Sequence, residues 1–267
     1  MPRRSNATAD TRLTGTQSIE RALTLLREIA AHNRSGSRLL DLATRTGLQR
    51  PTVHRMLKCL AAESMVQQDT DSHRYFLGPM VFELGLTAAP RFNLREICHP
   101  SLSRLAEATG DTVFLTQRSG LDSVCLDRRE GTFPIKTFTL EIGMRRPLGV
   151  GTGSLAILSA LQDDEIQAII AANTARLPEY GLNPGTLQSQ VKRSQKLGFA
   201  MRDLPGLSGV RSVGQALRNQ SGVAFAALSV STISSRMSDK RAIEVAQLLK
   251  NESRQLERQL LTGADGR

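Results

Sequence analysis

Residues 38–58 read RLLDLATRTGLQRPTVHRMLK and join a short apolar helix, a glycine turn and a second helix with a basic, hydroxyl-bearing face. Gly47 provides the turn, where a left-handed backbone conformation favours glycine. Pro51 stands in the first turn of the second helix, where its missing N–H leaves no hydrogen bond unmade. The order of these features predicts a helix-turn-helix whose second helix enters the DNA major groove. The buried side of the first helix is expected to comprise Leu39, Leu40, Leu42 and Ala43.

The polar face of the second helix carries the side chains expected to meet DNA. Arg50 and Arg55 are the candidates for contacts to base edges, because an arginine fork matches the O6 and N7 acceptors of guanine. Thr52 could meet a thymine methyl group or a phosphate. Phosphate contacts, which set register without specifying sequence, are expected from three cations outside or late in that helix. The full predicted set is Arg38, Gln49, Arg50, Thr52, His54, Arg55, Lys58 and Arg74.

Segments on either side complete a winged helix-turn-helix domain. Residues 17–31 show helical periodicity and predict a supporting helix with an apolar face. Two short strand-like runs, at about 65–69 and 74–77, predict a β-hairpin that forms a wing and also closes the small core. The side chains expected to point inward are Ile19, Leu23, Leu26, Ile29 and Ala30 in the supporting helix, Cys59 and Leu60 in the second helix, and Tyr75 and Leu77 in the hairpin.

Charge is distributed unevenly along the 267 residues, whose formal net charge is +10. Residues 1–80 carry +5, residues 81–186 carry −2 and residues 187–267 carry +7. The first block suits a domain that contacts a polyanion, and the second an ordinary globular core. The basic C-terminal block is either a solvated helix face or a contact to flanking DNA.

The order of expected elements divides the chain into a polar tail (1–14), a DNA-binding domain (15–78), a linker helix (79–93) and a larger domain (94–262). Strands in the larger domain are expected near 111–118, 122–129, 133–140, 199–203, 208–217 and 223–231, with helices between and after them. Hairpin-linked strands mixed with helices predict an α+β fold with an antiparallel sheet.

Five motifs make the chain similar to the IclR family of bacterial transcription regulators over about residues 15–262. They are SIERALTLL (18–26), TGLQRPTVHRMLKCL (46–60), YFLG (75–78), GMRRPLGVGTGSLAIL (143–158) and AALSVS (226–231). The resemblance implies a GAF-like effector-binding domain in the second half and a homodimer or homotetramer. Two departures stand out, because family members often have histidine at Gly149 and an acidic residue near Arg202. No family member's ligand is therefore transferred to this chain.

The glycine-rich segment 149–154 enters a helix and is the first candidate wall of an effector pocket. Glycines let the backbone approach a ligand, and free N–H groups at a helix N-terminus attract carboxylate or phosphate. Thr152, Gly153 and Ser154 are therefore expected to be ligand donors. The alternative is a glycine turn that only lets the chain enter the helix.

A second wall follows from strand alternation, which places Val223, Phe225, Ala227, Ser229 and Ser231 on one face, and Ser208, Val210, Ser212, Gly214 and Ala216 on another. The resemblance puts Ser212, Ser229 and Ser231 at pocket positions. An apolar cavity with a few hydroxyls suits a small organic acid, whose carboxylate Arg145 or Arg202 could pair with. For at least one of these arginines, solvation at the surface is the simpler outcome.

Two other classes of protein were weighed against an effector-controlled regulator. An enzyme domain is disfavoured because Cys98 and His99 are adjacent on a helix and point about 100° apart. Three scattered cysteines predict neither disulfides nor a metal site, so no cofactor is expected. A ligand-independent DNA-binding protein is the other alternative, disfavoured by the size of the second domain.

The expected partners are an operator in double-stranded DNA, a small-molecule effector and further copies of the chain, with RNA polymerase as an additional candidate. No apolar run approaches the ~20 residues of a membrane span and no signal-peptide pattern opens the chain. These patterns predict a cytoplasmic protein without a membrane partner.

Overall fold

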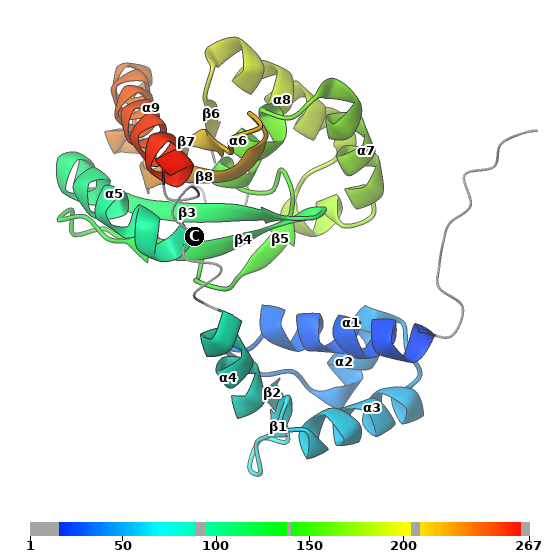
Figure 1. Cartoon of the computed structure of the whole chain (residues 1–267). Coiled ribbons are helices and arrows are strands. Elements are labelled where there is room, and N and C mark those ends of the chain that lie inside the picture. The colour runs from blue at the N-terminus through cyan, green and yellow to red at the C-terminus, as the bar shows by residue number, and fades with distance from the viewer. Residues whose placement is uncertain (1–15, 89–93, 138–139, 204–208, 263–267) are drawn as a thin grey trace, which may run out of the picture. The chain divides into compact units, whose positions relative to one another are not determined.

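The computed structural model describes residues 16–88, 94–137, 140–203 and 209–262. The chain divides into two compact units, Met1–Pro90 and Arg91–Arg267. Both units are shown in Figure 1, and each is taken by itself below.

The first unit is a winged helix-turn-helix. Helix α1 (Gln17–Ala31) supports α2 (Leu39–Thr46) and α3 (Arg50–Ala62), and the wing is the antiparallel pair β1 (Val66–Gln68) and β2 (Tyr75–Leu77), followed by α4 (Pro79–Ala88). Gly47 ends α2 at a φ of 67°, which is the left-handed conformation expected of the turn. The core that holds these elements comprises Leu25, Ile29, Leu42, Ala43, Val53, Leu57, Val66 and Tyr75.

Several expectations about this core were wrong. Ala30, expected to point inward, is exposed at the end of α1. Ile19 and Leu23 are 59% and 45% exposed, because α1 turns the stripe containing Leu25 and Ile29 inward instead. Leu40 is exposed on α2, and Cys59 is exposed on α3. Apolar residues on a helix of a small domain therefore outnumber the positions that its core can bury.

The second unit contains a six-stranded antiparallel sheet in the order β5-β4-β3-β8-β7-β6. Its strands are β3 (Thr112–Ser119), β4 (Asp122–Arg129), β5 (Arg145–Pro147), β6 (Ala200–Asp203), β7 (Val210–Arg218) and β8 (Ala224–Ile233). The described residues of 133–140 form no strand, so the expected third strand was wrong, and the edge is taken by the shorter β5. Ser208 lies outside the described residues.

Helices cover both faces of this sheet, as Figure 1 shows. Helices α5 (Leu94–Thr109) and α9 (Asp239–Thr262) pack on one face, with Leu102, Leu115 and Leu249 in the cluster between them. Helices α6 (Thr152–Ser159), α7 (Asp163–Asn173) and α8 (Pro184–Leu197) pack on the other, here called the α6 face. The expected α+β fold with an antiparallel sheet and flanking helices is confirmed.

Two register shifts decide which side chains reach the α6 face. Between β3 and β4 the pairing moves from Leu115–Asp127 to Thr116–Cys125, so Leu126 is an extra residue. Between β7 and β8, Phe225 is the extra residue and packs with the α5 and α9 cluster. The prediction that Phe225 shares a face with Ser229 was therefore wrong. None of the helices in the described ranges is long and apolar enough to cross a membrane.

Candidate functional site

Helix α3 presents a continuous polar face to solvent. Arg50, His54, Arg55 and Lys58 are exposed, and Thr52 is half-buried at the start of the helix. Gln49 is exposed at the N-cap, so its side chain lies beside the same face. Val53 and Leu57 anchor the opposite side in the core, which fixes the rotation of α3. Six of the eight predicted DNA-binding residues thus lie on one accessible surface of the second helix.

The other two predicted DNA-binding residues differ in how they are held. Arg38 precedes α2 with an exposed side chain, and its backbone N–H donates to the Asp41 carboxylate at 3.2 Å. Arg74 is half-buried, and its guanidinium Nη1 donates to the Gly36 carbonyl at 3.0 Å. This second contact ties the wing to the segment after α1. Arg74 therefore has a structural partner that the sequence did not indicate.

The α6 face of the sheet carries a buried polar row across four neighbouring strands, here called the hydroxyl row. Strand pairing joins Thr112 to Ser231, Ser231 to Ser212, and Ser212 to Arg202. All four side chains are nearly inaccessible to solvent. The Ser212 and Ser231 hydroxyls lie 2.5 Å apart and hydrogen bond to each other. The structure therefore brings three of the predicted effector-binding residues together, and adds Thr112.

Arg202 is a buried cation with an uncharged partner. It is 4% exposed, and its guanidinium donates to the side-chain oxygen of Gln190 on α8. Its Nε is buried without a hydrogen-bond partner, and no carboxylate in the described ranges forms a salt bridge with it. Burial lowers the pKa of Arg202 to about 10, because the charged form loses its hydration. An anion placed here would restore the missing electrostatic stabilisation.

The first turn of α6 lies against Thr116 on β3, Ser229 on β8 and Gly214 on β7. A Cβ on Gly153 would come within 3.0 Å of Thr116 Oγ1 and 3.3 Å of Ser229 Oγ. The Thr152 hydroxyl is buried without a partner, whereas Ser154 Oγ accepts from the Gly149 N–H at 2.7 Å. Thr152, Gly153 and Ser229 thus lie together, and Ser154 also serves to close the glycine turn.

Gly149 departs from the family pattern for a packing reason. Its φ is +99°, and a Cβ there would come within 2.9 Å of both Leu158 and Leu187. A side chain at this position would need a different arrangement of α6 and α8. The Leu158 and Leu187 side chains occupy the space that a side chain at this position would need.

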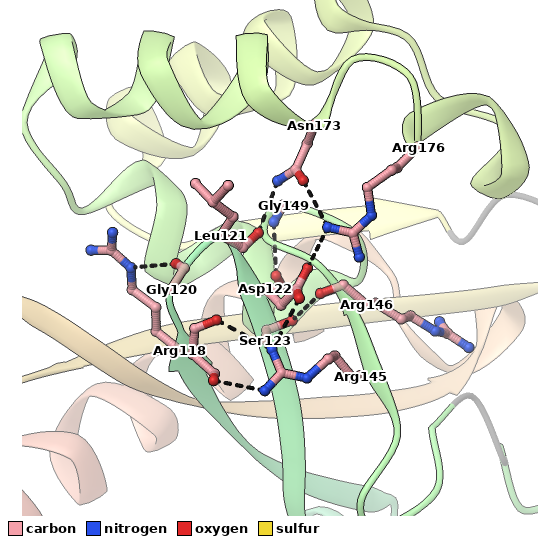
Figure 2. A network of polar contacts seen from close by, with 12 residues as sticks. Arg118, Gly120, Leu121, Asp122, Ser123, Arg145, Arg146, Gly149, Asn173 and Arg176 are labelled. Atoms are coloured by element: carbon pink, nitrogen blue, oxygen red, sulfur yellow. Dashed lines mark hydrogen bonds and ion pairs between the residues drawn. The ribbon is translucent and has the colours of Figure 1, made fainter. Parts of the chain in front are cut away.

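Arg145 does not join the hydroxyl row. It lies on β5 at the opposite side of the sheet from β6, and its Nη1 donates to Asp122 at 3.0 Å. Arg176 pairs with the same carboxylate at 2.7 Å, which ties β4 to the segment after α7. Figure 2 shows Arg145 turned back toward Asp122, whereas the neighbouring Arg146 extends away from that group. Arg145 is thus held in an ion pair at the edge of the sheet.

Arg146 and Thr116 line a small cavity that sequence reasoning missed. Arg146 pairs with Ser123 across the β4–β5 ladder, and its guanidinium lies 5.8 Å from the centre of the Tyr180 ring. Burial lowers the pKa of Arg146. The alternating buried pattern of β4, with Ser123 and Cys125 inward, was the available signal for a lined cavity. Its lining comprises Thr116, Ser123, Cys125, Leu140, Met144, Arg146, Val150 and Ser154.

The residues weighed for catalysis are held in structural contacts. Burial raises the pKa of the Cys98 and Cys125 thiols to about 12, so both are neutral near pH 7. His99 Nδ1 lies 3.3 Å from Asp127 Oδ2, on the face covered by α5. Within the described part of the chain, no three His, Cys, Asp or Glu side chains are grouped to hold a metal.

Family models match both units of the chain. The IclR helix-turn-helix domain matches residues 18–70, and the bacterial transcriptional regulator IclR C-terminal domain matches residues 86–258. The acetate operon repressor of Salmonella typhimurium is 27% identical over 237 residues, which cover 87% of this chain and 86% of that protein. The transcriptional repressor AllR of Escherichia coli is 25% identical over 244 residues, covering 91% and 89%.

Solved structures agree in fold. An IclR transcriptional regulator from a Silicibacter species superposes with a TM-score of 0.76 at 23% identity, covering 91% of this chain and 96% of that one. An IclR homolog from Microbacterium hydrocarbonoxydans, solved in complex with 4-hydroxybenzoate, has a TM-score of 0.69 at 17% identity, covering 92% and 99%. The acetate operon repressor, AllR and the IclR repressor of Escherichia coli are all named as repressors, in agreement with a regulator rather than an enzyme. This chain belongs to the IclR family of DNA-binding transcription regulators.

Proposed function

We propose that this regulator binds its operator through α3 and that a small organic acid, held in the second unit, controls the affinity. The observation that carries the proposal is Arg202, a buried cation beside the Ser212 and Ser231 hydroxyls and without a carboxylate partner in the described ranges. A guanidinium offers a carboxylate a bidentate fork, and hydroxyls can complete its hydrogen bonds. The 4-hydroxybenzoate complex of a homolog agrees with this ligand class, since that compound is a carboxylate.

The proposed effector site combines the hydroxyl row with the first turn of α6. It comprises Thr112, Thr152, Gly153, Ser154, Arg202, Ser212, Ser229 and Ser231. The Thr152 hydroxyl has no hydrogen-bond partner among the described residues, so a ligand oxygen there would satisfy it. Arg145, which is paired with Asp122, is left out of this site. The domain division proposed with it is 15–78 for DNA, 79–93 as linker helix and 94–262 for the effector.

On DNA, Arg50 and Arg55 are proposed to read bases, and Lys58 and Arg38 to contact phosphates. Arg74 contributes mainly by holding the wing, because its guanidinium is bonded to Gly36. Two recognition helices on a two-fold operator require two chains, with half-sites about one helical turn or a multiple apart.

Helix α4 is the surface proposed to join the two chains. It has no buried residue, and Phe82, Leu84 and Leu86 are 69%, 53% and 57% exposed. Exposed large apolar side chains on one short helix are typical of a protein interface. A second copy of the chain would cover them in a symmetric contact.

An effector can regulate only if it binds the DNA-competent and DNA-incompetent states unequally, and DNA must then change effector affinity by the same factor. Fluorescence anisotropy of the full chain on DNA from upstream of its own gene, with a scrambled duplex as control, tests specific binding. Repeating the titration with a panel of organic acids tests control by an effector. Identical operator affinity with every acid that binds the protein would contradict the coupling.

A further inference from the structure

The outward side of α9 carries a row of cations, here called the α9 ridge. It comprises Lys250, Arg254 and Arg258, which are all exposed and lie four residues apart. Side chains at this spacing lie on the same side of a helix, about 6 Å apart along its axis. The opposite side of α9, with Leu249 and Leu256, is buried against α5 and the sheet. The ridge therefore faces solvent.

The carboxylates of α9 do not neutralise the ridge. Glu252 pairs with Arg104 on α5 at 2.6 Å. Glu257 accepts a hydrogen bond of 2.8 Å from the backbone N–H at the end of β7. The other two, Asp239 and Glu244, lie in the first two turns of the helix. Both glutamates near the ridge thus hold neighbouring elements together, and the ridge keeps its positive charge.

The charge pattern of the ridge is unusual for a solvated helix face. Lys250 and Arg254 form no salt bridge within the described ranges, and Arg258 repeats their spacing. Like charges four residues apart repel, whereas solvated faces are typically stabilised by glutamate paired with lysine or arginine. The helix dipole does not account for these cations, because the last turn of α9 has no basic residue. A partner of opposite charge would make the arrangement favourable.

DNA is the polyanion that this chain itself brings close to the ridge. The chain belongs to a family of DNA-binding regulators. Its two units are joined by a short connection, since α4 ends at Ala88 and α5 begins at Leu94. A duplex bound by α3 is therefore held near the second unit at a high effective concentration. Each strand offers a phosphate about every 3.4 Å along the duplex axis, so each cation of the ridge can meet one.

We propose that the α9 ridge is a second DNA-binding surface, which contacts phosphates of the duplex without reading its sequence. Contacts from lysine and arginine to phosphate add affinity but carry no sequence information. The ridge lies on the face of the sheet opposite the proposed effector site and shares no residue with it. The proposal rests on the DNA binding of the family and does not require an effector.

Helix α8 offers a matched control with the same number of exposed cations. These are Lys192, Arg193 and Lys196. The first turn of α7, which carries three carboxylates, lies beside them, because the Gln195 amide donates to Asp163 at 3.3 Å. The α8 cations are thus balanced by nearby acids, and we expect them to contribute little to DNA binding.

The test uses a labelled scrambled duplex, so it needs no knowledge of the operator. Anisotropy of the full chain at several salt concentrations gives the slope of log affinity against log salt, which reports the phosphates neutralised. Glutamine at all three ridge positions should reduce the magnitude of this slope by about 2–3, near one for each lost contact. Glutamine at the three α8 positions lowers the net charge equally and should leave the slope near that of the wild type.

The ridge side chains are exposed, so the ridge variant should unfold at the same denaturant concentration as the wild type. If it does not, Arg254→Gln alone is measured, and the slope should then fall by about 1. An unchanged slope would overturn the proposal. Equal losses in the ridge and α8 variants would overturn it too, because they would reflect net charge alone.

A membrane surface is the competing partner for the ridge. If the ridge variant loses binding to vesicles of phosphatidylcholine and phosphatidylserine while its slope on DNA is unchanged, the ridge binds lipid and the proposal is wrong. Sequence-specific binding by α3 is measured separately, as the ratio of operator to scrambled affinity, which the ridge variant should preserve. Failure of the ridge proposal therefore leaves the proposed function standing, and the converse also holds.

Discussion

The Arg202 guanidinium on β6 donates a hydrogen bond to the side-chain oxygen of Gln190 on α8. An amide oxygen satisfies one donor but does not neutralise the charge. A buried cation with this partner destabilises the unliganded fold relative to an apolar residue of similar size. The arrangement is understandable if an anion completes it, because the binding free energy of that anion offsets the cost of the buried charge.

Replacement of Arg202 by methionine should therefore separate stability from ligand binding. We expect Arg202→Met to raise the free energy of unfolding of the unliganded protein by about 1–3 kcal/mol and to abolish organic-acid binding. Denaturant unfolding and calorimetry measure the two effects. Arg145→Met is the control and should lower stability, because it leaves Asp122 with one cation fewer. A destabilised Arg202→Met protein would contradict the assignment.

Replacement of Arg202 by methionine should also change how the free energy of unfolding depends on pH. The pKa of Arg202 is lowered to about 10 in the folded protein, so the unfolded chain binds more protons above that pH. The stability of the wild type should therefore increase, relative to Arg202→Met, as the pH rises through about 10. Paired unfolding curves of the two proteins from pH 8 to pH 11 measure the difference. Arg202→Met is expected to be the more stable protein at pH 8. A difference in free energy of unfolding between the two proteins that increases from pH 8 to pH 11 would contradict this prediction.

Gly153→Ala should block the effector site without removing a polar group. The added methyl would lie 3.0 Å from Thr116 Oγ1 and 3.3 Å from Ser229 Oγ. Alanine is favoured over glycine in a helix by about 1 kcal/mol, which offsets the cost of these close contacts, so the free energy of unfolding should change little. We expect acid affinity to fall at least tenfold while operator affinity without acid is unchanged. An acid affinity within twofold of the wild type would show that ligands do not approach this turn.

Arg55→Ala and Lys58→Ala should differ in how they affect DNA binding. If Arg55 reads a base, its removal should weaken operator binding by about 1–3 kcal/mol and scrambled DNA much less. Lys58→Ala should weaken both about equally and reduce the salt slope by about 1, as expected for a phosphate contact. Anisotropy at several salt concentrations measures both. Equal losses on the two duplexes for Arg55→Ala would make it a backbone contact.

Phe82→Glu tests the proposed role of α4 in dimer formation. A charge among Phe82, Leu84 and Leu86 should shift the chain toward monomer and weaken binding to a two-fold operator. Light scattering after gel filtration gives the mass. Ile243→Glu is the matched control, because Ile243 on α9 is 63% exposed but lies outside this helix. If Ile243→Glu dissociates the dimer and Phe82→Glu does not, the interface lies on α9 and not on α4.

Much of the fold follows from local patterns in the sequence. Turn chemistry at Gly47 and Pro51, and apolar spacing in 39–57, are sufficient for the helix-turn-helix. The inward face of helix α1 was assigned correctly at Ile29 but wrongly at Leu23, because two apolar stripes exist and only tertiary packing selects Leu25 over Leu23. Strand alternation fails where a β-bulge adds a residue, as it does at Phe225.

The candidate site was only partly predictable. Ser212, Ser229 and Ser231 were identified through alternation and resemblance, and strand pairing brings two of them together. Sequence spacing alone could not decide whether Arg145 or Arg146 faces the α6 side of the sheet. The two residues are adjacent on the short edge strand β5, so their side chains point to opposite sides. Thr116 was missed because a lone threonine in an apolar strand becomes informative only when its hydroxyl is known to lack a partner.

The extra residue at Leu126 has an electrostatic consequence. Cys125 and Asp127 are two residues apart and would share a face in a regular strand, but the register shift sends Asp127 toward α5, where it meets Arg95 and His99. Cys125 alone stays beside Thr116. The extra residue thus separates the side chains by charge: it places the Asp127 carboxylate on the α5 face and leaves the neutral Cys125 thiol on the α6 face.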